Sequence, residues 1–191
     1  MNLRNHYFIL RHGQTIYQTK KKDLVYPWPD KRSVKLTRKG EGQIKIAAKK
    51  LKKEKIDTIF SSDFFRTRQT AGIVAKELGS KAIFDKKLRD LDWGIYRGVP
   101  KKEVYRYFSR HSGHRFYRRP PQGENWSDCR KRMTNFLKNI DKKYKGKIIL
   151  IISHGDPLWL LEGAIKNWSM EKLLKVKRNK EFIKTGEFRK L

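Results

Sequence analysis

Two short apolar runs that each end in a histidine contain the residues whose types and spacing suggest chemistry. Near the N-terminus the run 8–10 is followed by Arg11 and His12, and far along the chain the run 148–152 is followed by Ser153 and His154. Imidazole can act as a base or a nucleophile near neutral pH, and a guanidinium binds oxyanions through paired hydrogen bonds. Two imidazoles and an arginine therefore predict a site for an anion.

The runs themselves indicate how these side chains are brought together. Both are rich in apolar residues and lead to a glycine, which is typical of fully buried strands of a parallel sheet. In open α/β sheets, ligands bind outside the carboxyl ends of the strands. If the two strands are parallel neighbours, His12 and His154 face each other in one crevice. Gly13 and Gly155 then allow backbone to come close to whatever binds there.

Arg66 is a third candidate for this crevice. Residues 57–60 predict a short strand, and the polar residues 61–63 supply cap residues for a helix over about 64–78. Arg66 falls in the first turn of that helix, where a cation opposes the helix dipole, and this local inconsistency indicates a use for the guanidinium. Because it follows the end of a strand, we expect Arg66 to project towards the two histidines.

The rest of the chain predicts a three-layer α/β/α fold, with a mostly parallel sheet covered on both faces. A single domain, 1–191, is expected at this length. Further expected elements are a loop over 18–35 with Pro27 and Pro29, a helix after the N-cap Thr37 that ends near Leu51, a strand at 82–84, a long helix capped by Ser127, a helix that Pro157 opens and that ends near Ile165, and a charged tail from Lys166 with an edge strand near Phe188.

The segment 99–122 alternates basic and aromatic residues and is expected to form a small cap over the strand ends. Such alternation occurs on surfaces that hold phosphates and stack rings. The alternative is a short helix that buries Val104 and Phe108 and turns its arginines outward.

Bulk composition limits the classes of protein. Lys and Arg number 48 against 19 Asp and Glu, a formal net charge of +29, which attracts polyanions and phosphorylated small molecules. We expect most lysines to coat solvated faces, so that nucleic-acid affinity is non-specific. The single cysteine, Cys129, excludes an intrachain disulfide and is expected in the core. The short N-terminal apolar run and the lack of a run of about 20 apolar residues predict a soluble cytoplasmic protein without membrane association.

A series of segments in order resembles the histidine phosphatase superfamily, specifically its phosphoglycerate-mutase-like branch. The resemblance covers almost the whole chain, which makes it far more specific than a lone Arg-His-Gly. The segments are 10–15, 36–43, 61–71, 88–98, 123–124 and 153–155.

The resemblance implies a role for each site residue. His12 would be the nucleophile that becomes phosphorylated, with Arg11, Arg66 and His154 around the phosphoryl group and Asp90 as the proton donor. Phosphate contacts would also come from Gln18 and Gly155.

The chain departs from the branch at several of its motif positions. Asp90 stands where the branch usually has Glu, and Asp92, two residues on, is its rival as the acid. Gln18 stands where Asn is common, Arg97 where an acidic residue often precedes the second glycine, and Asn125 where Ser is common.

These features predict a metal-independent phosphomonoesterase that acts on a small phosphorylated metabolite through a phosphohistidine. No carboxylate cluster with metal-ligand spacing is present in the sequence, so two guanidiniums and an imidazolium are expected to replace a metal, and no cofactor is expected. One alternative is a phosphoglycerate mutase, which returns the phosphoryl group to substrate; the compact chain lacks the longer insertions of those enzymes. A second is a basic module for nucleic acid or phosphoprotein, with vestigial chemistry.

Overall fold

A mixed sheet of five strands, in the order β3-β2-β4-β1-β5, forms the middle of the molecule. We describe it from a computed structural model, in which residues 1–28, 30, 32–109 and 114–191 are described. The first four strands in this order run parallel, and β5 is antiparallel to β1. The strands are β1 (His6–Arg11), β2 (Thr58–Ser61), β3 (Ala82–Phe84), β4 (Ile148–Ser153) and β5 (Phe188–Lys190).

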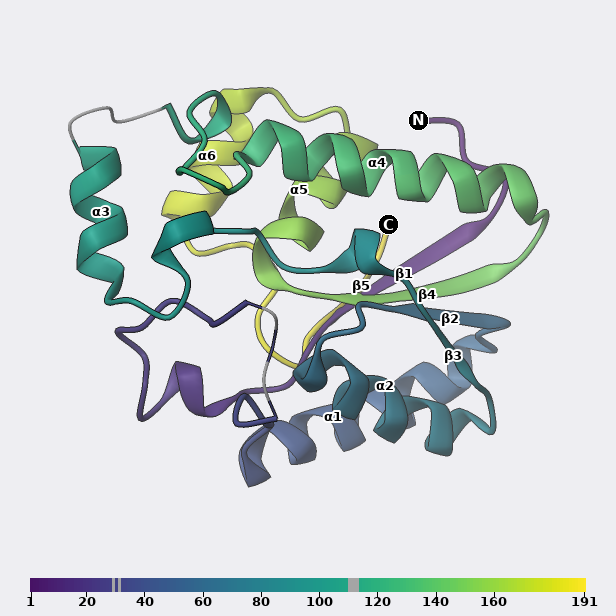
Figure 1. The fold of residues 1–191 in the computed structure, drawn as a ribbon. Coiled ribbons are helices and arrows are strands. Elements are labelled where there is room, and N and C mark those ends of the chain that lie inside the picture. The colour runs from purple at the N-terminus through teal and green to yellow at the C-terminus, as the bar shows by residue number, and fades with distance from the viewer. Residues whose placement is uncertain (29, 31, 110–113) are drawn as a thin grey trace.

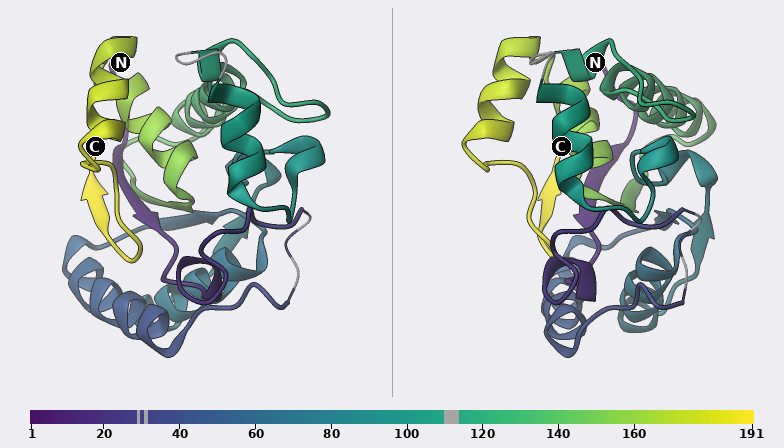
Figure 2. Two further views of the ribbon diagram at one scale, coloured as in Figure 1. Left: turned by 90° about the vertical axis from the view of Figure 1, so that its left-hand side faces the viewer. Right: turned by 60° about the vertical axis from the view of Figure 1, so that its left-hand side comes forward.

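Helices cover both faces of the sheet, which confirms the predicted three-layer fold (Figure 1). Helices α1 and α2 pack on one face, and α4 and α5 on the other, with α6 beside α5. Helix α3 stands beyond the carboxyl ends of the parallel strands (Figure 2). The helices are α1 (Arg38–Leu51), α2 (Phe65–Leu78), α3 (Lys101–Ser109), α4 (Trp126–Lys143), α5 (Gly155–Ile165) and α6 (Met170–Arg178). None of the described helices is long and apolar enough to cross a membrane.

The two central strands are buried on both faces because successive side chains of a strand point to opposite sides. In β1, Ile9 packs into the core beneath α4 and α5, and Leu10 packs into the core above α1 and α2. In β4, Ile151 likewise packs into the first of these cores and Ile152 into the second. This two-sided burial explains why both strands are apolar runs without alternation.

The register of these strands places the two histidines at the same level. Leu10 pairs with Ile152 and Arg11 with Ser153 in the parallel ladder. His12 and His154 therefore leave the sheet side by side at its carboxyl edge, as predicted.

The structure corrects the predicted caps or starts of three helices. Helix α2 is not capped by residues 61–63, because its N-cap is Phe64, which makes no side-chain cap hydrogen bond. Helix α4 is capped by Asn125 and not by Ser127, since the Asn125 side chain accepts the Asp128 N–H at 2.8 Å. Helix α5 begins at Gly155, two residues before Pro157, so that His154 is its N-cap.

The charged tail holds a helix that the sequence did not reveal. Helix α6 buries Leu173 and Val176 among its lysines, and two apolar side chains are too few for a clear helical period. The edge strand expected near Phe188 is present as β5. Thr37 caps α1 as predicted, through its side-chain oxygen and the Gly40 N–H.

The segment 99–122 contains features of both alternatives that its sequence left open. Val104 and Phe108 of α3 are buried, as the short-helix interpretation requires. Tyr105 and Arg115 line a cavity, as expected of residues that face a ligand. Residues 110–113 of this segment lie outside the described residues.

Candidate active site

The His12 ring is held in one tautomer. Its Nδ1 lies 2.8 Å from the carbonyl oxygen of Gly13. Because a carbonyl can only accept, Nδ1 carries the proton and Nε2 keeps its lone pair. Nε2 lies 3.4 Å from Nε of Arg66, and the whole residue is 1% exposed. This arrangement leaves Nε2 unprotonated, and it accepts a hydrogen bond from the positively charged guanidinium of Arg66.

Arg66 is fully buried and contacts three charged or ionisable side chains at once. Its Nε donates towards His12, its Nη2 lies 2.8 Å from Oδ2 of Asp90, and its Nη1 lies 3.0 Å from Oδ1 of Asp30. The ring of Tyr26 covers the guanidinium, with its centroid 4.1 Å from Cζ. The predicted projection of Arg66 towards the histidines is confirmed.

His154 stands against His12, with 5.2 Å between the two ring centroids. Its Nε2 lies 2.9 Å from the Oγ of Ser62, and its Nδ1 lies 3.8 Å from Oδ2 of Asp90. Nδ1 is buried and has no hydrogen-bond partner among the described residues. A buried nitrogen without a partner is costly unless a ligand supplies one.

Arg11 lies over Gly155, where a side chain would press against its guanidinium. A Cβ on Gly155 would come within 3.0 Å of the Arg11 Cζ. The guanidinium is anchored from the far end of the chain, since its Nη1 donates to the carbonyl of Ile183 at 3.1 Å. Its Nε is buried without a partner among the described residues. Arg11 thus keeps donor capacity for an anion.

Burial and charge shift the pKa values of the site in directions that suit phosphoryl transfer. Burial, followed by the charges of Arg66 and Arg11, lowers the pKa of His12 well below 6.5. Burial and Arg66 lower the pKa of His154 in the same way. Burial raises the pKa of Asp90, against the opposing effect of Arg66. The site therefore favours two neutral imidazoles and a carboxyl group that takes up a proton more readily than usual.

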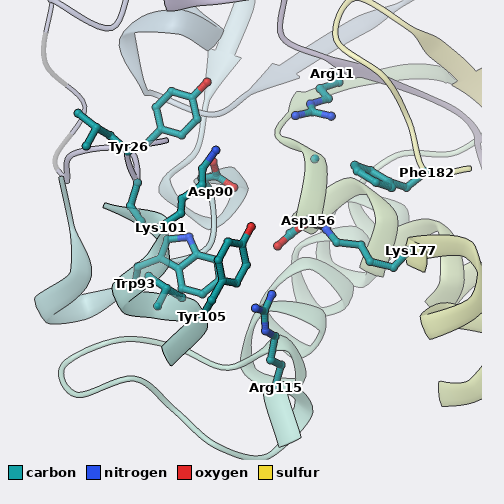
Figure 3. Close-up of a pocket in the computed structure, with 14 residues that line it drawn as sticks. Arg11, Tyr26, Asp90, Trp93, Lys101, Tyr105, Arg115, Asp156, Lys177 and Phe182 are labelled. Atoms are coloured by element: carbon teal, nitrogen blue, oxygen red, sulfur yellow. Dashed lines mark hydrogen bonds and ion pairs between the residues drawn. The ribbon is translucent and has the colours of Figure 1, made fainter. Parts of the chain in front are cut away.

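A cavity of about 340 Å³ lies next to Arg11 and Asp90 (Figure 3). Arg11, Asp90 and Gly155 line it. Its cationic and aromatic wall comes from α3, α6 and the connections between elements: Lys101, Arg115, Lys177, Tyr26, Trp93, Tyr105 and Phe182. A pocket with such a lining fits a ligand that carries negative charge and a flat or apolar part.

Several residues named from the sequence do not line this cavity. His12, Arg66 and His154 are buried, and Arg66 and His154 contact the lining residue Asp90. Asp92 forms an ion pair with Arg97 at 2.7 Å, and its carboxylate lines a separate cavity. The positive charge of Arg97, which departs from the pattern of the branch, is thus neutralised by the carboxylate of Asp92. Gln18 directs its side-chain amide to Thr15 and to the hydroxyl of Tyr26, and does not line the cavity. Among the described residues, the side chain of Gln18 is linked to the site by its hydrogen bond to Tyr26.

Four residues that contribute to the site were missed by sequence reasoning. Tyr26 and Asp30 lie in a loop without periodicity, where only the mixture of aromatic, proline and acidic residues marked the stretch. Asp156 directly follows the second His-Gly, and that position was a usable signal. Its carboxylate pairs with Lys177 of α6 and accepts from Trp126 at 3.3 Å. Lys177 carried no signal in a lysine-rich tail.

Within the described part of the chain, no three His, Cys, Asp or Glu side chains are grouped so that they could hold a metal ion. The cations next to His12 and His154 are supplied by Arg11 and Arg66.

Comparison with known proteins agrees with this arrangement. A profile described as histidine phosphatase superfamily (branch 1) matches residues 7–182. A Serratia proteamaculans protein named probable phosphoglycerate mutase GpmB is 30% identical over 164 residues, which cover 83% of this chain and 73% of that protein.

Two solved structures share the fold. The α-ribazole phosphatase of Shigella flexneri has a TM-score of 0.80 and 18% identity over 97% of this chain and 89% of its own. A mycobacterial glucosyl-3-phosphoglycerate phosphatase has a TM-score of 0.78 and 20% identity, with 97% and 89% covered.

Proposed function

We propose that this chain, which belongs to the histidine phosphatase superfamily (branch 1), hydrolyses phosphomonoesters through a phosphohistidine formed on His12. The observation that supports this most directly is the tautomer of His12. Its Nδ1 is tied to the Gly13 carbonyl, and its Nε2 lone pair lies beside Arg66 in a site with a second imidazole. An unprotonated ring nitrogen is what a nucleophilic histidine needs.

In the first step, Nε2 of His12 attacks phosphorus, an N–P bond forms and the bond to the ester oxygen breaks. Negative charge is spread over the three other phosphoryl oxygens in the transition state. Arg11 and Arg66 provide fixed positive charge for them. Nδ1 of His154, which has no hydrogen-bond partner among the described residues, adds a donor in the tautomer whose Nε2 accepts from the Ser62 hydroxyl. The N-terminus of α5, which begins at Gly155 in the cavity wall, adds oriented N–H groups.

Asp90 donates the proton that the departing oxygen needs. Its carboxyl lines the cavity, and burial raises its pKa above the ordinary value. A bound phosphate dianion raises that pKa further and offsets the opposing effect of Arg66. In the second step, Asp90 takes a proton from a water molecule that attacks phosphorus. The N–P bond breaks, and phosphate and neutral His12 are restored.

The wall of the cavity suggests the kind of substrate. Three cations and four aromatic rings line it beyond the phosphoryl site. A small phosphorylated metabolite that bears further negative charge, and a flat or apolar group, would be favoured over a neutral alkyl phosphate.

A phosphoglycerate mutase is the second candidate, because the relative from Serratia is named as one. Both functions begin with the same phosphohistidine. They differ in whether water or a second substrate oxygen takes the phosphoryl group.

A panel of phosphorylated metabolites, assayed for phosphate release with and without EDTA, tests the proposal. We expect release that EDTA does not abolish, and the inactive His12→Ala variant serves as the control. Isomerisation of a phosphoglycerate without net phosphate release would favour the mutase. Activity lost with EDTA and restored by magnesium or zinc would contradict a metal-independent reaction.

A further inference from the structure

Asp30 contacts Arg66 at two points, although the loop that carries it is distant in sequence. Its Oδ2 accepts a hydrogen bond from the Arg66 backbone N–H at 3.3 Å. Its Oδ1 lies 3.0 Å from the guanidinium Nη1, and the two side chains are 1% and 0% exposed. Neither of these two atoms has a hydrogen-bond partner with standard geometry among the described residues. The carboxylate is thus next to both the backbone and the side chain of one arginine, away from water.

The N-terminus of α2 lacks a capping side chain and a negative charge of its own. Its N-cap, Phe64, makes no side-chain cap hydrogen bond, and its first turn holds no acidic residue. The cation of Arg66 lies in that same turn, where it opposes the positive end of the helix dipole. A negative charge supplied from outside the helix offsets both effects.

The guanidinium is enclosed on its other sides as well. The rings of Tyr26 and Phe64 lie over it, with centroids 4.1 Å and 5.2 Å from Cζ. Asp90 contacts Nη2 from the cavity side. Neither Asp30 nor Arg66 lines the cavity, and the carboxylate of Asp30 contacts Arg66 at its backbone and its guanidinium, so we expect its effect on a substrate to pass through that arginine.

We propose that Asp30 is a positioning residue for Arg66: by holding Nη1 and the first turn of α2, it fixes the guanidinium for the transferring phosphoryl group. This inference rests on the proposed phosphoryl transfer at His12. Arginine can meet a phosphoryl group with paired hydrogen bonds only if its plane is correctly oriented. Misplacement by about 1 Å can cost about a hundredfold in rate.

Removing the charge of Asp30 should have opposite effects on two kinds of ligand. The transition state needs the oriented guanidinium, so its binding should weaken. Ground-state phosphate gains from the loss of a nearby negative charge, and this gain offsets the poorer orientation. A merely structural role would lower the amount of folded protein and leave both affinities of the folded fraction unchanged.

The test compares Asp30→Asn with the wild type in the full chain. Asparagine keeps the size and a side-chain oxygen that can accept the hydrogen bond of the Arg66 backbone N–H. The readouts are kcat and KM on p-nitrophenyl phosphate, the calorimetric Kd of inorganic phosphate and of orthovanadate, and the melting temperature. Asp92→Asn is the matched control, because that carboxylate also pairs with an arginine but lies in a separate cavity. If Asp30→Asn does not fold, Asp30→Ser replaces it, since serine also caps helices and carries no charge.

We expect kcat and vanadate affinity to fall about tenfold to a hundredfold in Asp30→Asn. Phosphate affinity should stay within about threefold or become tighter. In an Arg66→Lys background the same substitution should cause little further loss, because Asp30 acts through the guanidinium. An unchanged or higher kcat, or a full additional loss beside Arg66→Lys, would overturn the proposal. If the wild type hydrolyses no ester, the proposed function fails, and the vanadate and phosphate affinities still decide the role of Asp30.

Discussion

Asp90 and Asp92 lie two residues apart, yet they face different partners. Asp90 lines the cavity and contacts Arg66, whereas Asp92 is paired with Arg97 and lines a separate cavity. The sequence left both as candidates for the general acid, because their order along the chain does not show where an irregular segment turns. The structure favours Asp90 by position, and burial raises its pKa in the direction that an acid requires.

Asp90→Asn should distinguish good leaving groups from poor ones. An alkyl alkoxide needs a proton as it departs, so hydrolysis of alkyl phosphates should slow by roughly a hundredfold to ten-thousandfold. A nitrophenolate hardly needs one, so the phosphorylation step with p-nitrophenyl phosphate should slow far less. Burst kinetics isolate that step, and Asp92→Asn is the control, expected to resemble wild type. Equal loss on both substrates in the first step would mean that Asp90 donates no proton.

Strands β1 and β4 could be predicted because the signal for each lies within a few consecutive residues. A continuous apolar run followed by His-Gly indicates a buried parallel strand, and the observed register brings the two histidines together. The cap of α2 and the starts of α4 and α5 were not predicted correctly. For α2 the reason is that Asp30 contacts the Arg66 N–H from a distant loop, and a contact between distant segments leaves no periodic signal in either.

The loop between β1 and α1 has more influence on the site than its sequence suggested. Tyr26 lies over Arg66, and its ring centroid is 6.4 Å from that of His12, which is 1% exposed. Phosphorus must approach Nε2 to within about 3.5 Å for reaction. We therefore expect the ring of Tyr26 to shift when substrate enters.

Replacing Tyr26 should change the accessibility of His12. We expect Tyr26→Ala to accelerate modification of His12 by diethylpyrocarbonate, measured peptide by peptide with mass spectrometry, because the covering ring is gone. Tyr26→Phe keeps the ring and should react nearly as slowly as wild type. Equal rates in all three proteins would show that Tyr26 does not limit access.

The stability of the whole molecule should depend on the two buried histidines. Their pKa values lie well below 6.5 in the folded state, so below pH 6.5 the unfolded chain binds protons that the folded chain does not. The free energy of unfolding should therefore fall with decreasing pH, by up to about 1.4 kcal/mol per pH unit for each histidine, until the lowered pKa is reached. Urea unfolding between pH 7.5 and 5 measures this slope.

The variant His154→Asn provides the control for that slope. It removes one of the two groups, so the slope should be roughly halved whatever the variant does to stability at pH 7.5. A free energy of unfolding that stays constant from pH 7.5 to 5 would contradict the neutral state of the buried rings.

The surplus of positive charge extends well beyond the cavity, which four of the 48 Lys and Arg residues line. With a net charge of +29, we propose that nucleic acid binds weakly and without sequence preference, through counterion release. Fluorescence anisotropy with unrelated duplexes should give similar affinities that fall steeply as salt rises. Affinity for one sequence that persists at high salt would support a specific nucleic-acid-binding role.

The phosphoenzyme itself tests the central claim most directly. Wild-type protein is mixed with a labelled phosphomonoester in EDTA, quenched within one turnover, and the phosphorylated peptide is identified by mass spectrometry. We predict acid-labile, base-stable phosphate on Nε2 of His12, none in His12→Ala, and decay of the label to free phosphate. Two results would contradict the account. One is release of phosphate with no label on His12 during the first turnover, and the other is a His12→Ala variant that is as active as wild type.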